Sequence, residues 1–361
     1  WLIDLGFPLA VAVLVVTGHT LAAALIESTR QRLAAEAGLA GILCLLLVRR
    51  PLRFALGLGV LFVAASLYTW DTGKTLHAER TFYGVLRVKW TPGKPFRVGD
   101  SEDPDRTYRI PSHSLHHGTT RHGRQMLNPE LRYQAASYYH PTGPIGRVFL
   151  SGRDLGLFHN VAFVGMGVGC LAAYGEPGQR FVFYEVDPAV ARIARHPKFF
   201  SYISDCRAEV SVEIGDGRVL LGQAPDGTFD LIVVDAFSSD AIPVHLLTRE
   251  AFEACFDKLR PDGLLALHLT SRYFDLVPIV RSIAYDLRLE GLVWHDQVVT
   301  AKQAIEGKSR SLWALLGRTP GHLEPFVSQP EWRDLRTVVD RPPNPRNLWT
   351  DNYSSPLRAL K

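Results

Sequence analysis

Hydrophobic and polar positions divide the chain into two unlike parts. Residues 1–70 contain long runs without charged side chains, and the first run, 5–26, has 22 residues. That length is enough to cross the roughly 30 Å hydrocarbon core of a bilayer. Shorter apolar runs follow at 33–48 and 54–70, with basic or aromatic residues at their ends, as membrane interfaces favour. The pattern predicts transmembrane helices, and a buried soluble helical bundle is the alternative.

The rest of the chain reads as a soluble enzyme in two parts. Residues 71–150 suit a small β-rich subdomain, because 80–88 alternates and is rich in β-formers, and 109–126 is strand-like but interrupted by glycines. The stretch 91–112 is full of Pro, Gly, Asp and Ser and predicts a loop or a hairpin connection. Since the chain does not begin with methionine, we expect residues 1–70 to be a fragment of a larger membrane region.

Residues 151–361 alternate between strand and helix patterns. The predicted strands are 161–165, 180–187, 208–216, 229–237, 263–269, 292–296 and 311–317, and the predicted helices begin or lie at 170–174, 188–196, 246–260 and 275–289. Units of this size with continuous apolar strands predict a doubly wound sheet covered on both faces. Its ligand is expected at the carboxyl ends of the first strands.

A glycine turn, Gly165, Gly167 and Gly169, follows the first of these strands. The dinucleotide fingerprint G-x-G-x-x-G would need glycine at position 170, where this chain has Cys170. The observed spacing suits a turn on which an adenosyl group lies flat, without a pyrophosphate to hold. We therefore expect a nucleoside site of the adenosyl-sulfonium kind.

Carboxylates follow the next strands at the same edge of the sheet. Glu185 closes the second strand, where an acid can accept both ribose hydroxyls. Asp187, before a proline, is better explained as a helix N-cap. Asp216 in the turn "GDGR" can accept from an adenine amino group or simply shape the turn. Asp235 ends a buried strand, where turn chemistry does not need a carboxylate, and is expected to be functional.

Several motifs together resemble the spermidine synthase family of aminopropyltransferases, which has the class I methyltransferase fold. They are "VAFVGMGVGC", "YEVDP", "GDGR" and "DLIVVDAFSSDAIPVHLLT". The stretches "ERTFYGVLRV", "HGTTRHGRQ", "SYYHPTGPIG" and "LWTDNYSSPL" resemble its membrane-fused bacterial branch, over roughly residues 79–358. The resemblance implies a class I methyltransferase-like sheet with a small N-terminal β subdomain, preceded by transmembrane helices.

The same resemblance implies roles at matching positions. Glu185 would bind the ribose, Asp216 with Gly217 the adenine, and the glycine turn the thioadenosine. Asp235 would orient and deprotonate the attacking amine, and Asp240 is a second acid. The remaining matches are Gln125 at the nucleoside site, Tyr139 at the substrate site and His122 in a loop that lines it.

The implied reaction transfers an aminopropyl group from decarboxylated S-adenosylmethionine to an amine such as putrescine, and methylthioadenosine leaves. The family's glycine turn carries an aspartate for the aminopropyl ammonium, whereas this chain has Val168. S-adenosylmethionine itself is therefore the alternative donor, for a methyltransferase or another transferase. A non-catalytic nucleoside-sensing module is the third hypothesis.

Composition and charge exclude some partners. A net charge of +4 without a basic–aromatic stripe does not predict nucleic acid binding. The scattered cysteines and the His116, His117 and His122 cluster lack ligand spacing, so we expect no metal. The resemblance allows a homodimer.

The charges flanking the apolar runs leave the membrane orientation open. Arginines in 49–53 favour a cytoplasmic loop there, whereas basic residues in 74–89 favour the reverse. A donor made in the cytosol favours the second arrangement. We expect a multi-pass inner membrane protein with its catalytic domain in the cytoplasm.

Overall fold

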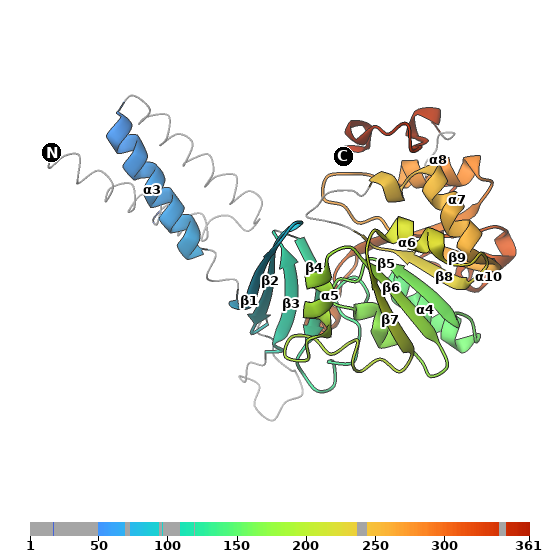
Figure 1. The fold of residues 1–361 in the computed structure, drawn as a ribbon, viewed down its shortest axis with the longest axis horizontal. Helices are drawn as coiled ribbons and strands as arrows, with labels where there is room; N and C mark the ends of the chain where they lie inside the picture. The colour runs from blue at the N-terminus through green and yellow to red at the C-terminus, as the bar shows by residue number, and fades with distance from the viewer. Residues whose placement is uncertain are drawn as a thin grey trace. The chain divides into compact units, whose positions relative to one another are not determined.

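The computed structural model divides into two compact units, Trp1–Lys74 and Thr75–Lys361. Both are drawn in Figure 1. The structure describes residues 17, 50–68, 73–93, 96, 109–118, 120–236, 244–338 and 344–361. The predicted boundaries at 70 and 150 remain predictions.

Helix α3 (Pro51–Tyr68) is the described element of the first unit. It covers most of the predicted apolar run 54–70, while the runs 5–26 and 33–48 lie outside the described residues. Among the residues that the structure describes, no helix is long and apolar enough to span a membrane.

A four-stranded antiparallel sheet opens the second unit. Its strands, in the order β1-β2-β3-β4, are β1 (Lys74–Thr81), β2 (Gly84–Thr91), β3 (Ser112–His117) and β4 (Thr120–Met126). The prediction of one strand over 80–88 is wrong, because Phe82 and Tyr83 form a turn and Gly84 has a φ of +134°. A left-handed φ of this kind is open to glycine and costly for other residues, so the chain reverses there.

The large sheet has the order β12-β10-β11-β9-β8-β5-β6-β7. Its strands are β5 (Asn160–Val164), β6 (Arg180–Glu185), β7 (Glu209–Ile214), β8 (Phe229–Val234), β9 (Leu259–His268), β10 (Glu290–Asp296), β11 (Ser311–Gly317) and β12 (Arg333–Asp334). The five strands β7, β6, β5, β8 and β9 pair in parallel, as predicted. Strand β11 then pairs antiparallel with both β9 and β10. This is a methyltransferase-like α/β fold preceded by an antiparallel β subdomain.

Helices and short 3-10 turns connect these strands (Figure 1). They are α4 (Pro144–Asp154), η2 (Cys170–Tyr174), α5 (Pro188–Arg195), α6 (Gly217–Gln223), η3 (Val244–Leu246), α7 (Arg249–Lys258), α8 (Val277–Asp286), α9 (Ala301–Ile305), α10 (Pro320–Val327), η4 (Pro345–Asn347) and η5 (Pro356–Ala359). Sequence analysis predicted η2, α5, α7 and α8, but not α4, α6, α9 or α10.

Successive residues of the central strands enter two separate cores. Val161 and Phe163 of β5 face one core with Phe149 of α4, whereas Ala162 and Val164 face the other with α6, α7 and α8. Because strand side chains alternate between faces, a strand buried on both sides needs a continuous apolar run. The prediction of a sheet covered on both faces is confirmed.

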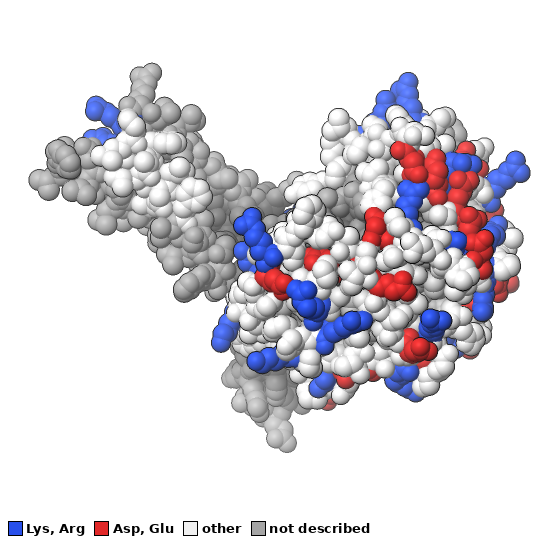
Figure 2. Space-filling model, viewed as in Figure 1, with Lys and Arg blue, Asp and Glu red and all other residues white. Residues whose placement is uncertain are grey.

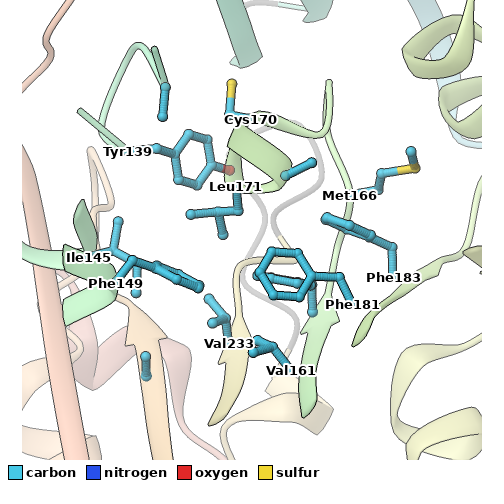
Figure 3. Close-up of a cluster of buried hydrophobic side chains, with 14 of the residues drawn as sticks. Tyr139, Ile145, Phe149, Val161, Met166, Cys170, Leu171, Phe181, Phe183 and Val233 are labelled. Carbon is cyan, nitrogen blue, oxygen red and sulfur yellow. The ribbon is translucent and has the colours of Figure 1, made fainter. Parts of the chain in front are cut away.

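The first core also reaches the predicted site. Figure 3 shows Tyr139 and Cys170 at one end of this cluster and Val161 and Val233 at the other. Leu86, Val88 and Leu115 of the small sheet belong to the same core. The small sheet is therefore packed against the large one beside the glycine turn.

Candidate active site

The glycine turn is held between strands β4 and β8. A Cβ on Gly165 would lie 2.3 Å from the Asp235 carbonyl oxygen, and one on Gly167 would lie 2.3 Å from the His122 carbonyl oxygen. Gly167 also has a φ of +54°. Contacts this close exclude any side chain, so the glycines allow both neighbouring backbones to reach the turn.

Val168 occupies the place where the resembled family carries an aspartate. Its side chain is buried, with an exposed fraction of 1%. A Cβ on Gly123 of β4 would lie 2.4 Å from a Val168 methyl group. Val168 therefore packs against the small sheet, in a place where an unpaired carboxylate would be costly.

Glu185 ends β6 beside the glycine turn. Its carboxylate accepts hydrogen bonds from the backbone N–H groups of Met166, at 3.0 Å, and Asp187, at 2.9 Å. Burial raises the pKa of Glu185 above its ordinary value, although both N–H donors act to lower it. Each carboxylate oxygen keeps a further lone pair, so the residue can still accept from a bound hydroxyl group.

Asp187 and Asp216 both cap helices. The Asp187 side chain accepts from Ala189 N at the start of α5, which confirms the predicted N-cap. Asp216 accepts from Arg218 N and Val219 N at the start of α6, so its carboxylate has a structural role, and its contact with adenine stays a prediction. Gly215 N donates to Glu185 O at 2.9 Å, which brings the "GDGR" turn with Gly217 beside Glu185.

Asp235 follows β8 directly, and its side chain is 5% exposed. One carboxylate oxygen accepts from the Tyr139 hydroxyl group, and the other lies 2.7 Å from His268 Nδ1. Burial alone would raise the pKa of this carboxyl, but the attraction and hydrogen bond of His268 and the Tyr139 hydrogen bond outweigh it. The resulting pKa lies below the ordinary value, so the carboxylate is charged at neutral pH.

His268 extends this network beyond what the sequence predicted. Sequence analysis did not place this residue in the site, whereas its Nδ1 lies 2.7 Å from Asp235 and its Nε2 lies 2.7 Å from Thr270 Oγ1. Its ring stacks between Tyr138, at 4.3 Å, and Trp313, at 4.8 Å. The available signal was its position at the end of β9, the strand that pairs with β8.

Tyr139 and His122 are the residues predicted on the substrate side, and their contact with a substrate stays a prediction. Tyr139 contacts Asp235, and burial raises its own pKa well above the ordinary value, which keeps the hydroxyl group a donor. His122 has its carbonyl oxygen against Gly167, and its charge helps to lower the pKa of Asp235. Asp240 lies outside the described residues, so its role stays a prediction.

Gln125 has a structural task in β4. Its side-chain amide donates to Arg132 O and Ser201 Oγ and accepts from Ser201 N, all within 2.9 Å. These bonds use both donors of the buried amide and tie β4 to the segment after α5. Its contact with a nucleoside remains a prediction.

Within the described ranges, no group of three His, Cys, Asp or Glu residues could hold a metal ion. A cavity of about 320 Å³ lies beside Asn160, Arg180 and Phe229. These residues begin β5, β6 and β8, so the cavity lies at the amino ends of the strands, away from Asp235.

Comparisons with known proteins give distant matches. No family model matches the chain. A polyamine aminopropyltransferase from Vibrio vulnificus is 31% identical over 122 residues, which cover 32% of this chain and 40% of the relative. Putrescine N-methyltransferase 3 from Nicotiana tabacum is 26% identical over 185 residues, covering 49% of this chain and 42% of the relative.

A solved structure gives a similar result. The crystal structure of a probable spermidine synthase from Corynebacterium glutamicum aligns with a TM-score of 0.46 and 15% identity, over 73% of this chain and 92% of that one. The chain spans about two fifths of the length of the curated relatives named above. The match to the curated aminopropyltransferase bears out the predicted similarity to the spermidine synthase family of transferases over 32% of this chain.

Proposed function

We propose that this protein is a membrane-tethered, spermidine synthase-like aminopropyltransferase. It takes an aminopropyl group from decarboxylated S-adenosylmethionine, passes it to an amine such as putrescine and releases methylthioadenosine. One observation carries the proposal: a charged, buried Asp235, held by Tyr139 and His268, directly beside the glycine turn. Simple nucleoside binding would not need a carboxylate oriented in this way.

The nucleoside would be held by neighbouring groups. Glu185 has free lone pairs for the ribose hydroxyls, and the side-chain-free glycine turn offers a surface for the thioadenosine. The donor supplies a carbon activated by a sulfonium, whose leaving group is a neutral thioether. The protein's remaining task is to align and deprotonate the amine.

Asp235 is suited to that alignment. Each of its oxygens has one lone pair in use and one left to accept an N–H of the amine. The amine nitrogen's lone pair forms the new C–N bond while the C–S bond breaks and its electron pair returns to sulfur. The nitrogen then carries the positive charge and releases a proton, which the Asp235 network can receive. Tyr139 and His268 fix the carboxylate and do not touch the reacting atoms.

A methyl transfer is the alternative. Val168 removes the carboxylate that would hold an aminopropyl ammonium, and putrescine N-methyltransferase 3 is among the similar proteins. The chemistry at Asp235 would be the same, with S-adenosylmethionine as donor and a methyl carbon as the group transferred. A nucleoside-sensing module is the third reading and would bind without turnover.

Tethering rests on the apolar runs of residues 1–70. We infer a multi-pass protein of the inner membrane, with residues 71–361 in the cytoplasm, where the donor is made. A homodimer is the assembly expected from the resemblance. Protease accessibility of the catalytic domain in sealed inner-membrane vesicles of either orientation tests the topology.

The activity test uses the full chain in detergent with putrescine and each donor, and it detects methylthioadenosine and S-adenosylhomocysteine. Wild-type protein should release methylthioadenosine, and Asp235→Asn should be slower by about 10²–10⁴-fold. Asp230→Asn is the matched control, because Asp230 lies on the same strand but pairs with Arg260 at 2.7 Å. S-adenosylhomocysteine alone would favour methyl transfer, and binding without either product would favour the sensing module.

A further inference from the structure

Two arginines of β4 project from one face of the small sheet. Arg124 is opposite Ser114 and Arg121 is opposite His116, and the register shifts between Leu115 and His116. Ser114 and His116 are two residues apart on β3, so their side chains share a face, and so do those of their partners. The irregularity thus places Arg121 and Arg124, three residues apart, on the same side. We call these two residues the arginine pair.

Further basic residues share this face. In the next strand, Arg87 is opposite His116 and Lys89 is opposite Ser114. Burial, together with the charges of Lys89 and the arginine pair, lowers the pKa of His116 to about 4. Figure 2 shows more basic than acidic side chains on the visible surface over the small sheet. The face is therefore cationic across three strands.

The arginine pair lacks carboxylate partners among the residues that the structure describes. Arg121 Nη2 donates to Ser309 Oγ at 2.9 Å. The Arg124 side chain makes no hydrogen bond or ion pair with a described residue, and the Nε atoms of both arginines are buried without an acceptor there. Burial lowers the pKa of both, to about 10 for Arg124. A buried cation without a counter-ion is costly, so this arrangement calls for a bound anion.

The arginine pair is linked to the Asp235 network through Ser309 and Tyr138. The charge of Arg121 acts on Tyr138, whose ring stacks on His268 at 4.3 Å. Ser309, the partner of Arg121, follows Lys308, which forms a buried ion pair with Asp296 at 2.9 Å. The backbone of Ser137 also bonds to Gly307 and Ser309. These contacts join the arginine pair to the Asp235 network.

We propose that the arginine pair binds a carboxylate of the reacting molecules while Asp235 orients the amine. The planar guanidinium group matches a carboxylate by two parallel hydrogen bonds. The carboxylate can belong to an acceptor of the amino-acid type or to a donor that keeps its carboxyl group. The inference rests on the proposed transfer at Asp235, but it replaces either putrescine or the decarboxylated donor of that proposal with a molecule that carries a carboxylate.

Two matched pairs of ligands show whether the bound carboxylate belongs to the donor or to the acceptor. S-adenosylmethionine and its decarboxylated form differ in one carboxylate, and 4-aminobutanoate and putrescine differ by a carboxylate in place of an ammonium. Calorimetry measures the affinity of each, the acceptors in the presence of methylthioadenosine. In at least one pair, the wild-type chain should bind the carboxylate ligand about tenfold or more tightly. Equal affinities in both pairs, or preference for the decarboxylated donor and putrescine, would overturn the inference.

Variants assign the preference to these residues. Arg124→Met and Arg121→Met should reduce the affinity ratio to about twofold or less, while Arg124→Lys keeps part of it. Arg87→Met is the matched control, since it removes one exposed charge from the same face and should leave the ratio unchanged. If Arg121→Met and Arg124→Met leave the affinity ratio unchanged, the carboxylate is not bound by the arginine pair.

The melting temperature of the ligand-free chain tests the inference without a measurement of turnover. Removing a buried, unpaired charge should raise the melting temperature of the ligand-free Arg124→Met chain. If Asp240 neutralises the pair instead, Arg124→Met and Asp240→Asn would lower the melting temperature by similar amounts, and the inference would fall. Failure of the proposed transfer is seen separately, as wild-type rates in Asp235→Asn.

Discussion

Glu185 and Asp235 stand at equivalent places, at the carboxyl ends of β6 and β8, the two strands that flank β5. Both carboxylates are buried, yet their pKa values shift in opposite directions. Glu185 accepts from neutral backbone N–H groups, which only partly offset the cost of burial. Asp235 faces His268 and Tyr139, whose attraction and hydrogen bonds together outweigh that cost.

The two sides of the site are also assembled differently. The nucleoside side uses bonds that are local or link adjacent strands, since Glu185 contacts the turn 19 residues before it and Asp216 caps its own helix. The transfer side joins Asp235 to Tyr139, 96 residues away, and to His268, 33 residues away. In our proposal, the nucleoside side of the site is thus held by local turns, whereas the transfer side joins several elements.

The largest loss of binding and turnover is expected from a substitution in the glycine turn, between the nucleoside side and the transfer side of the site. Gly167→Ala places a Cβ against the His122 carbonyl oxygen and imposes a left-handed φ on alanine, which alone costs about 1–2 kcal/mol. Nucleoside binding and turnover should both fall, because β4 must move away from the turn. Chemical denaturation and calorimetry measure the two losses.

Gly178→Ala is the control for this substitution. Gly178 has a φ of +86°, but a Cβ there meets nothing within 4 Å. It should lose only the conformational part of the stability and keep nucleoside affinity. Equal losses in the two variants would show that the contact between the turn and β4 is unimportant.

Substitutions at Tyr139 and His268 should have a smaller effect, which distinguishes the transfer side of the site from the nucleoside side. Tyr139→Phe and His268→Gln each remove one partner of Asp235, so kcat should fall about tenfold, the value of one hydrogen bond to a charged group. Methylthioadenosine affinity should change less than about twofold, because neither residue contacts the glycine turn in our proposal. Steady-state kinetics with calorimetry on the same samples gives both numbers. Loss of affinity with unchanged kcat would contradict the division.

The opposite pKa shifts predict opposite pH dependence. Glu185 has a raised pKa in the folded protein, so its ionised form opposes folding, and its contribution to stability falls as pH rises through that pKa. Asp235 has a lowered pKa, so its contribution is present above the unfolded pKa and is lost as pH falls through the folded one. Stability curves of Glu185→Gln and Asp235→Asn, measured from about pH 3 to pH 8, should therefore differ from wild type in opposite senses.

The raised pKa of Glu185 also predicts how nucleoside affinity depends on pH. Because the ionised Glu185 accepts the ribose hydroxyls in our proposal, affinity should decline as pH falls through its raised pKa, by up to about tenfold per pH unit. The Glu185→Gln chain should show a flat profile. A pH-dependent profile in that variant would assign the titration to another group.

Periodicity predicted most of the large sheet, because strands buried on both faces leave continuous apolar runs. It missed α6, whose cap Asp216 was interpreted mainly as a ligand, and the short helix α9. It also merged β1 and β2 into one strand, since the turn at Phe82 and Tyr83 has no turn-forming residue except the following glycine. Nor does alternation show that β11 runs antiparallel to β9.

The sequence pointed to those candidate site residues whose position along the chain is itself a signal. The glycine turn, Glu185 and Asp235 could be singled out because each lies at the end of a predicted strand. His268 could not be assigned to Asp235, because that contact depends on the pairing of β8 with β9. The arginine pair was also hidden, since only the register of β3 and β4 shows that its members share a face.

The central claim is that nucleoside binding and group transfer are divided between Glu185 and Asp235. The direct test is calorimetric binding of methylthioadenosine to Glu185→Gln and Asp235→Asn, with Glu213→Gln of the exposed neighbouring strand as control. Glu185→Gln should weaken binding about tenfold or more, the cost of losing bonds to a charged group. Asp235→Asn and Glu213→Gln should stay within about twofold of wild type. Equal weakening by Glu185→Gln and Asp235→Asn, or unchanged affinity in Glu185→Gln, would contradict the division.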